Sequence, residues 1–328
     1  MGGILSHLAG IEEPEVLVLG ITGKQGSSSS RLMREFGTRV VAGCTPGKGG
    51  RDVDGVPVFD SPEQAVRAFP GINSAVLFVP SRAVLEATRG LIELGIRFVV
   101  LTADGVPTHD AIRVRVLSMR SGTRVMGPNT VGMLDTEGYL FGMIGGRGRW
   151  ARENYTPGCV GVISRSGGLS QLLGAFHCRR NLPGPGPDGR LQPLWGDDSP
   201  GVSAVLCTGG DPVPGTTMLE AARAFQADPR TRVIAAYGET GTSQENDLAE
   251  AMLRGEIDKP VVIFLGGRFT RPGVAQSHAG AMIRSESETY EAKRAALEKA
   301  GARVVDRPDA VFSATASILG LSRGPAEA

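Results

Sequence analysis

Residues 15–26 have the sequence EVLVLGITGKQG, and this stretch decides the fold. Its apolar half, residues 15–19, predicts a buried β-strand, and the glycines and serines that follow predict a tight turn into a helix ending near Phe36. Glycines between a first strand and a helix N-terminus form a backbone cradle for a phosphate group. We therefore predict that the chain opens with a βα unit that binds a phosphorylated ligand.

The glycine spacing differs from that of dinucleotide-binding proteins. It is G-x-x-G-x-x-G rather than G-x-G-x-x-G, and the next predicted strand, residues 39–43, ends at Gly43 where an NAD site usually carries an acid. Both features disfavour an NAD-dependent dehydrogenase, which we keep as an alternative. Residues 43–49 have three residues between their glycines and no Ser or Thr after Lys48, so they are no Walker motif. A lysine on a Gly-rich loop at the carboxyl end of a strand still suits a phosphorylated ligand.

Apolar strands alternate with helices through the rest of the chain, which predicts mainly parallel α/β sheets with ligands at the carboxyl ends of the strands. A length of 328 residues suggests about two domains. Residues 144–158 are rich in Gly, Arg and Pro, so we predict domains at 1–145 and 158–328. The strands are expected near residues 75–79, 98–101, 124–126, 159–163, 202–207, 233–237, 261–265 and 303–305.

Composition narrows the class of protein. Hydrophobic residues make up 41% and charged residues 21%, and the net charge is +1, so nothing indicates binding to nucleic acid or to a membrane surface. The four cysteines lack C-x-x-C spacing, which favours free thiols over disulfides or a metal site. The sequence has no apolar run of 18 residues and no secretory signal, so we predict a soluble cytoplasmic protein.

A second candidate site surrounds His278. The predicted strand at residues 261–265 runs through a Gly- and Pro-rich loop into SHAGA, residues 277–281, where small neighbours leave the imidazole open to a phosphoryl group or another subunit. The alternative is a loop histidine without a function. Ser166-Gly167-Gly168 opens another predicted helix and offers free N–H groups to an anion. A serine hydrolase is disfavoured because G-x-S-x-G is missing.

Eight short motifs together carry a resemblance to a known family. In chain order they are ITGKQG, TPGKGG, DGVP, GPNTVG, SRSGG, GGDPVPG, GETG and SHAGA. In this order they resemble the α subunit of succinyl-CoA synthetase and the matching region of citryl-CoA synthetase and ATP-citrate lyase. The resemblance implies an N-terminal Rossmann-like domain that binds coenzyme A and a C-terminal flavodoxin-like ligase domain.

The resemblance also implies roles for single residues. His278 matches the histidine that is phosphorylated, and Glu239 matches the carboxylate that orients it. Ser166, Gly167 and Gly168 match the helix start that holds the phosphoryl group, and Gln171 lies where the acid substrate is expected. The positions that match coenzyme A contacts are Thr22, Gly23, Lys24, Gln25, Lys48, Thr102, Ala103 and Asp104.

The implied reaction has three steps: phosphorylation of His278 by ATP or GTP with Mg²⁺, transfer of the phosphoryl group to a carboxylate, and attack by the coenzyme A thiol. The resemblance implies that an ATP-grasp β subunit supplies the nucleotide site, in an αβ or (αβ)₂ assembly. The acid is succinate, malate or citrate. Because Gly168 and Gln171 depart from the succinate pattern, a citrate-type subunit is one alternative, and a noncatalytic coenzyme A-binding paralogue is another. Residues 179–201 are foreign to both patterns.

Overall fold

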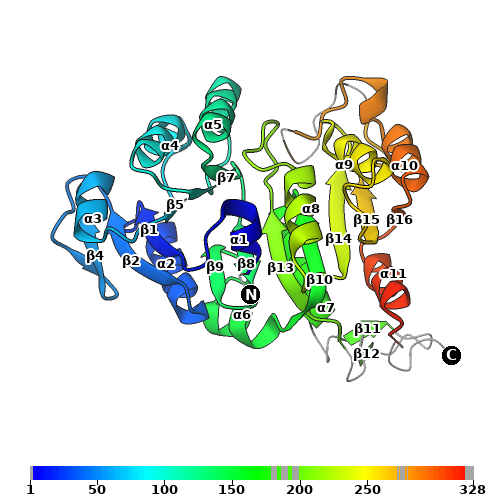
Figure 1. Cartoon of the computed structure of the whole chain (residues 1–328), viewed down its shortest axis with the longest axis horizontal. Coiled ribbons are helices and arrows are strands. Elements are labelled where there is room, and N and C mark those ends of the chain that lie inside the picture. Colours follow the sequence, from blue (N-terminus) through cyan, green and yellow to red (C-terminus); the bar gives the residue numbers. More distant parts are fainter. Residues whose placement is uncertain are drawn as a thin grey trace.

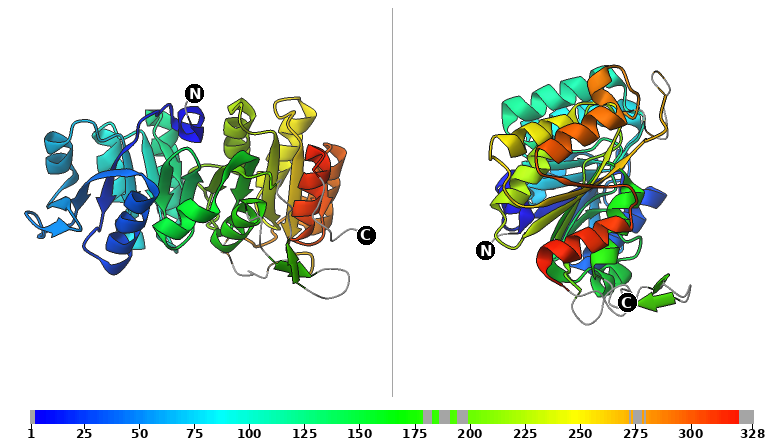
Figure 2. Two further views of the ribbon diagram at one scale, coloured as in Figure 1. Left: turned by 90° about the horizontal axis from the view of Figure 1, so that it is seen from below. Right: turned by 90° about the vertical axis from the view of Figure 1, so that its right-hand side faces the viewer.

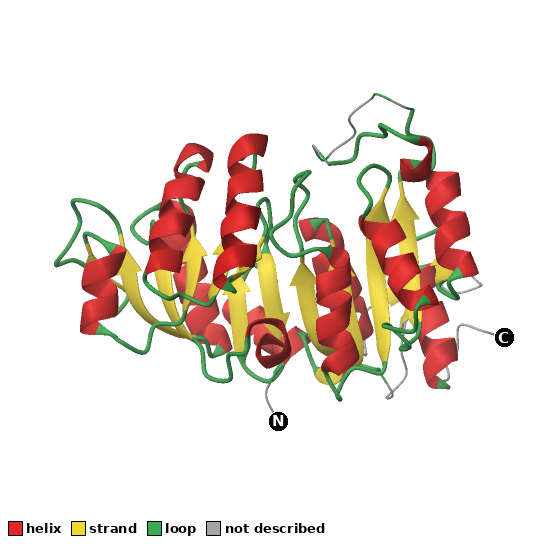
Figure 3. Cartoon of the chain, turned by 45° about the horizontal axis from the view of Figure 1, so that its top comes forward, coloured by secondary structure: helices red, strands yellow, loops and turns green. Residues whose placement is uncertain are grey.

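A computed structural model describes residues 3–178, 183–185, 191–193, 199–271, 273, 278 and 280–321. Two mainly parallel seven-stranded sheets lie side by side along the molecule (Figure 1). Helices cover both faces of the strands, as the end-on view in Figure 2 and the secondary-structure colours in Figure 3 show. The predicted α/β architecture is therefore confirmed.

The first sheet has the strand order β3-β4-β2-β1-β5-β6-β7. All its pairs are parallel except β3 with β4. Its strands are β1 (Glu15–Leu19), β2 (Arg39–Cys44), β3 (Asp52–Val53), β4 (Val56–Phe59), β5 (Ser74–Leu77), β6 (Phe98–Leu101) and β7 (Arg124–Met126). The helices of this half are α1 (Ile4–Ala9), α2 (Lys24–Phe36), α3 (Pro62–Ala68), η1 (Ser81–Ala83), α4 (Val84–Glu93) and α5 (Thr108–Ser121).

The second sheet has the strand order β16-β15-β14-β10-β13-β8-β9, with an antiparallel hairpin at one edge. Its strands are β8 (Gly132–Asp135), β9 (Tyr139–Gly142), β10 (Pro157–Ser164), β13 (Val202–Cys207), β14 (Val233–Glu239), β15 (Val261–Gly266) and β16 (Arg303–Val305). The helices of this half are α6 (Gly148–Asn154), α7 (Gly167–Cys178), α8 (Met218–Ala227), α9 (Gln244–Leu253), η2 (Glu286–Glu288), α10 (Tyr290–Lys299) and α11 (Ala310–Leu319).

The chain changes sheets earlier than the predicted boundary at residues 145–158. Strands β8 and β9 pair with β13, so the change falls between β7 and β8. Helices also pack across the two halves: α1 packs against α8, and α6 packs against α2. The hairpin belongs to the second sheet because β8 pairs with β13, which lies some 70 residues further along the chain. The division into two separately folding domains stays a prediction.

Polar contacts join the two halves where β7 ends. The Glu220 carboxylate on α8 pairs with Arg115 at 3.0 Å and with Arg124 at 2.6 Å. Backbone bonds lie beside this pair: the Gly215 N–H donates to the Gly127 carbonyl at 2.7 Å. The halves therefore meet through a hydrogen-bonded surface near the carboxyl ends of the strands.

Some predicted features fall outside the part of the chain that the structure describes. These are most of residues 179–201 and the small residues next to His278 at 274–277 and 279. Within 179–201 the structure describes a short antiparallel pair, β11 (Pro183–Pro185) with β12 (Leu191–Pro193). Among the residues described, no helix has the length and apolarity needed to span a bilayer.

Candidate active site

His278 and Glu239 meet above the carboxyl ends of the second sheet. Glu239 is the last residue of β14, and its Oε1 lies 2.7 Å from His278 Nδ1. The Glu239 side chain is 4% exposed and the imidazole 22% exposed. A carboxylate only accepts hydrogen bonds, so this contact fixes the proton on Nδ1 and leaves Nε2 with a free lone pair. The two residues that the sequence singled out are thus brought together across 39 positions of the chain.

The pKa of His278 is raised above its ordinary value. The hydrogen bond to Glu239 raises it most, burial lowers it, and the Arg165 charge lowers it as well. Glu239 therefore stabilises a positive charge on the ring, including the charge that develops when Nε2 acts as a nucleophile.

A buried ion pair fixes the end of β14. Lys293 on α10 donates from Nζ to the Glu239 carbonyl at 2.7 Å and to the Gly241 carbonyl at 2.6 Å, and it pairs with Glu245 on α9. The Glu239 N–H in turn donates to Glu245 Oε1 at 2.9 Å. Both side chains of the pair are fully buried. The backbone that carries the Glu239 carboxylate is thus held from both sides.

Two glycines let the His278 loop approach the sheet. A Cβ added to Gly210 would lie 2.6 Å from Cδ2 and 3.2 Å from Nε2 of His278, so the imidazole packs directly on this glycine. The Gly280 N–H donates to the Gly210 carbonyl at 3.2 Å. A Cβ on Gly280 would collide with the guanidinium of Arg165. Sequence analysis assigned no individual role to Gly210, Gly280 or Arg165.

Arg165 is fully buried and incompletely paired. Its guanidinium lies 3.9 Å from Glu245 Oε1, and among the described residues none of its three nitrogens has a hydrogen-bond partner. A buried cation without hydrogen bonds is costly, and the Glu245 carboxylate at 3.9 Å offsets its charge in part, so some of its positive field still acts on the imidazole.

The predicted phosphate-binding residues lie where α7 begins. Strand β10 ends at Ser164 and α7 starts at Gly167, so Ser166 is the residue just before the helix. Gln171 is engaged locally: its Nε2 donates to the Gly167 carbonyl at 3.2 Å, and its Oε1 accepts from the Gly145 N–H at 2.9 Å. Binding of an acid by Gln171 would have to replace these bonds, so its substrate role stays a prediction.

The predicted coenzyme A residues lie at the corresponding edge of the first sheet. Gly23 caps α2 without a side-chain hydrogen bond, which leaves the first-turn amides open to an anion. A Cβ on Gly26 would collide with the Gly20 carbonyl, so only glycine permits this turn. The Thr22 N–H donates to Thr45 Oγ1 at 3.4 Å, and Thr102 Oγ1 donates to the Leu77 carbonyl at 2.7 Å.

Two hollows flank this edge. One of about 480 Å³ is largely apolar and lies between the ends of the first strands and α4, and one of about 420 Å³ includes Lys24 and Gln25. Sequence analysis did not predict the apolar residues that line the larger hollow. Pro80, which directly follows the predicted strand at residues 75–79, is one of them. Its lining includes Gly20, Cys44, Thr45, Phe78, Val79 and Pro80.

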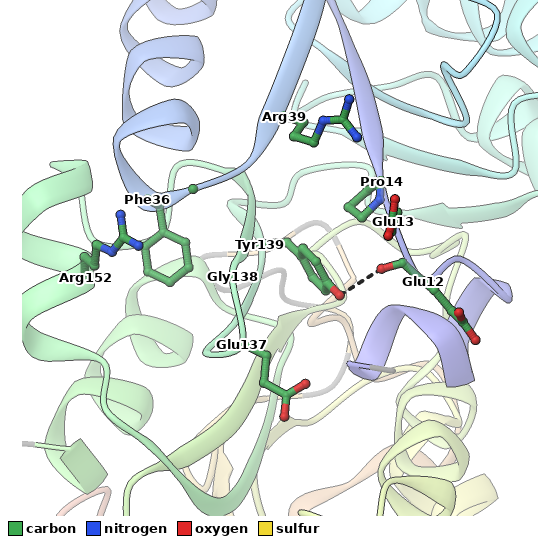
Figure 4. Close-up of a pocket in the computed structure, with 10 residues that line it drawn as sticks. Glu12, Glu13, Pro14, Phe36, Arg39, Glu137, Gly138, Tyr139 and Arg152 are labelled. Carbon is green, nitrogen blue, oxygen red and sulfur yellow. Dashed lines mark hydrogen bonds between the residues drawn. The ribbon is translucent and has the colours of Figure 1, made fainter. Parts of the chain in front are cut away.

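Another hollow of about 480 Å³ contains none of the predicted site residues. It lies where Arg39 begins β2 and Tyr139 begins β9, with Arg152 of α6 opposite (Figure 4). The Tyr139 hydroxyl donates to the Glu12 carbonyl at 2.9 Å across it. Because this is the amino end of β2, the hollow is remote from the His278 edge.

Comparison with protein families defines the class. Residues 11–105 match the model of the CoA binding domain, and residues 163–303 match that of the CoA-ligase. A coenzyme A-binding domain followed by a ligase domain defines an enzyme subunit of the acid–thiol ligase class.

Individual relatives narrow the family. The chain is 35% identical over 309 residues, 94% of this chain and 98% of the relative, to the ADP-forming sulfoacetate-CoA ligase subunit SauD of Bilophila wadsworthia. It is 35% identical over 295 residues, 90% of this chain and 92% of the relative, to the α 1 subunit of the ADP-forming succinate–CoA ligase of Archaeoglobus fulgidus. The chain belongs to the succinate–CoA ligase α-subunit family.

A solved structure agrees with this assignment. An ATP citrate lyase of Methanosaeta concilii in complex with (3S)-citryl-CoA superposes with a TM-score of 0.80 at 25% identity. The alignment covers 94% of this chain, and the chain spans about half, 50%, of the length of that protein. The predicted resemblance is therefore confirmed, and coenzyme A binding with it.

Proposed function

We propose that this chain is the catalytic α-type subunit of an ADP-forming acid–CoA ligase, with His278 as the phosphoryl carrier. The 2.7 Å contact between Glu239 Oε1 and His278 Nδ1 carries this proposal, because it supplies a nucleophile together with the group that orients it. Nε2 attacks the terminal phosphorus of the nucleotide, and ADP leaves. A carboxylate oxygen of the acid then takes the phosphoryl group from Nε2, which gives an acyl phosphate. The thiol of coenzyme A displaces phosphate from it.

The first sheet fits coenzyme A. The uncapped α2 terminus with Thr22 to Gln25 suits the diphosphate, Lys48 adds a cation on the neighbouring loop, and the apolar hollow suits the adenine ring. Residues 102–104 lie on the same edge, after β6. Replacing Lys48 by Met removes one charge from an otherwise unchanged site, so coenzyme A binding measured by calorimetry is expected to weaken about tenfold. Lys299→Met, on the exposed face of α10, is the matched control.

We infer that the acid carries at least two acidic groups. Relatives are named for sulfoacetate, succinate and malate, each of which has a second carboxylate or a sulfonate. Relatives are also named as α subunits or as ligase subunits, which supports a β partner that binds ATP or GTP with Mg²⁺. The chain with its β partner is expected to turn over one of sulfoacetate, succinate, malate or citrate, and to leave the monoanion acetate unchanged.

Brief incubation of the complex with γ-labelled ATP tests the phosphoryl carrier. We expect an acid-labile label on this chain that disappears in His278→Ala and persists in His109→Ala, a control on an exposed histidine. Label that survives in His278→Ala would contradict the proposal, and so would an unlabelled wild-type chain in a complex that still forms acyl-CoA.

A further inference from the structure

Asp211 has a buried carboxyl group, and one of its two oxygens has no hydrogen-bond partner among the described residues. It lies on the loop between β13 and α8 and is 3% exposed. Its Oδ1 accepts from Asn129 Nδ2 at 3.1 Å. Its Oδ2 is buried and has no hydrogen-bond partner within the described part of the chain. Burying an unpaired carboxylate oxygen costs free energy. A polar group of a bound ligand that contacts this oxygen would remove that cost.

Hydrogen bonds connect the coenzyme A edge to His278 through this loop. The Asn129 N–H donates to the Ala103 carbonyl at 2.8 Å, within the predicted coenzyme A contacts. The Asn129 carbonyl accepts from the Gly210 N–H at 3.3 Å, and Gly210 packs on the imidazole. Asp211 is the next residue. It therefore occupies the junction that the thiol must reach to meet an acyl group activated at His278.

Burial and the neighbouring groups together raise the pKa of the Asp211 carboxyl above its ordinary value. Burial raises its pKa most. The bond from Asn129 and the nearby backbone N–H of Val106 lower it, the neighbouring Asp104 raises it, and His278 lowers it. The guanidinium of Arg165 and the Asp211 carbonyl both lie beside Gly280, where an added Cβ would meet each of them. A raised pKa makes the carboxylate a stronger base, which suits a group that accepts a proton.

We propose that the Asp211 carboxylate is the general base that takes the proton from the coenzyme A thiol. This inference rests on the proposed function. The sulfur attacks the carbonyl carbon of the acyl phosphate, a carbon–sulfur bond forms, and the carbon–oxygen bond to phosphate breaks. The proton passes from sulfur to Oδ2, and inorganic phosphate leaves with the electron pair. The protonated carboxyl group then releases its proton to solvent when the products leave.

Asp211→Asn tests this role, because an amide oxygen still accepts the bond from Asn129 but takes no proton. The variant complex is expected to label His278 and to form hydroxylamine-trappable acyl phosphate at the wild-type rates. Its thioester formation at pH 7 is expected to fall about 100-fold. As the pH is raised toward the thiol pKa, the difference in rate between the variant and the wild type should shrink about tenfold per pH unit. The reason is that more of the coenzyme A thiol is then already ionised and needs no base. Asp258→Asn, the same change on the surface, is the control.

The outcomes separate this inference from the proposed function. Normal labelling together with wild-type thioester formation in Asp211→Asn would overturn the inference alone. A deficit that does not narrow as the pH rises would indicate a structural role and would also overturn it. A wild-type complex that forms acyl-CoA without labelling His278 would overturn the proposed function, and the general base assignment with it.

Discussion

At the scale of single residues, the proposed function depends on one carboxylate and one imidazole. Glu239 is almost fully buried, so its hydrogen bond to His278 is little weakened by water, and it raises the pKa of the ring. The protonated ring is a favourable partner for Glu239 but a poor nucleophile. The same contact therefore orients the ring and sets the pH range in which it reacts.

Replacing Glu239 by Gln is expected to lower the pKa of His278 and to slow its phosphorylation about 100-fold, because the ring loses its orienting acid. In the wild type the rate should fall on acidification with a midpoint above the ordinary histidine value of about 6.5. In Glu239→Gln that midpoint should move to lower pH. Labelling rates against pH and NMR titration of the ring measure both. An unchanged midpoint would show that Glu239 does not control the ring.

The raised pKa also affects folding. A histidine whose pKa is higher in the folded chain stabilises the fold fully below about pH 6.5, and it loses this contribution as the pH rises through the folded value. In His278→Gln, denaturant unfolding should show the largest loss of stability near pH 5.5 and little loss near pH 8.5. A loss that is the same at both pH values would contradict this.

Gly210→Ala tests whether the close packing of the His278 imidazole on Gly210 is needed for phosphorylation. The added methyl group would meet the ring at 2.6 Å, so His278 must shift, at a cost of about 1–3 kcal/mol. We expect the chain to stay folded and phosphorylation of His278 to fall more than about tenfold. Gly90→Ala, at an open position on α4, should change neither quantity.

At the scale of elements, α9 and α10 hold the end of β14 through Glu245 and Lys293. Neither charge is exposed, so each depends on the other and on the backbone groups that they bind. The geometry of the Glu239 carboxylate is therefore set by two helices that contribute no atom to the reaction.

Lys293→Met leaves the buried Glu245 carboxylate without its hydrogen-bonded cation and with only the more distant Arg165, 3.9 Å away, among the described residues. The free energy of unfolding is expected to fall by about 3–5 kcal/mol. Adding Glu245→Gln should recover part of that loss, because the unpaired charge is then gone. Urea unfolding of the two single variants and the double variant measures the coupling. Strictly additive losses would mean that the pair is not coupled.

At the scale of the whole molecule, the two halves meet through Glu220, which pairs with Arg115 and Arg124. Burial opposes the shift, but a backbone bond at Thr217 and the two arginines together lower the pKa of Glu220. This carboxylate therefore stabilises the fold above about pH 4.3, and the contribution is lost as the pH falls through its lower folded value.

Glu220→Gln is expected to lower stability by about 1 kcal/mol at neutral pH, because the three side chains are partly exposed and water screens the pairs. The loss should shrink in high salt. Glu153→Gln, which removes an exposed i,i+4 pair on α6, is the control and should have almost no effect. An equal loss for both variants would contradict a special role for the junction.

The sequence by itself determined the alternation of strands and helices and the glycine turn after β1. It also predicted, through the motifs of the family it resembles, that His278 and Glu239 belong to one site. These follow from local patterns, namely apolar runs, glycine turns and ordered motifs. The sequence missed the β8–β9 hairpin. The hairpin is short and antiparallel, and it is placed only by its pairing with β13.

Only the tertiary structure decided which distant side chains share a site. The ion pair of residues 245 and 293 and the Asn129–Asp211 hydrogen bond join segments separated by 48 and 82 positions. The contact between residues 239 and 278 spans 39 positions, and it was expected only because the resemblance implied it. No local pattern encodes such contacts. They arise because parallel strands bring their carboxyl ends to one edge, where the loops that follow them meet.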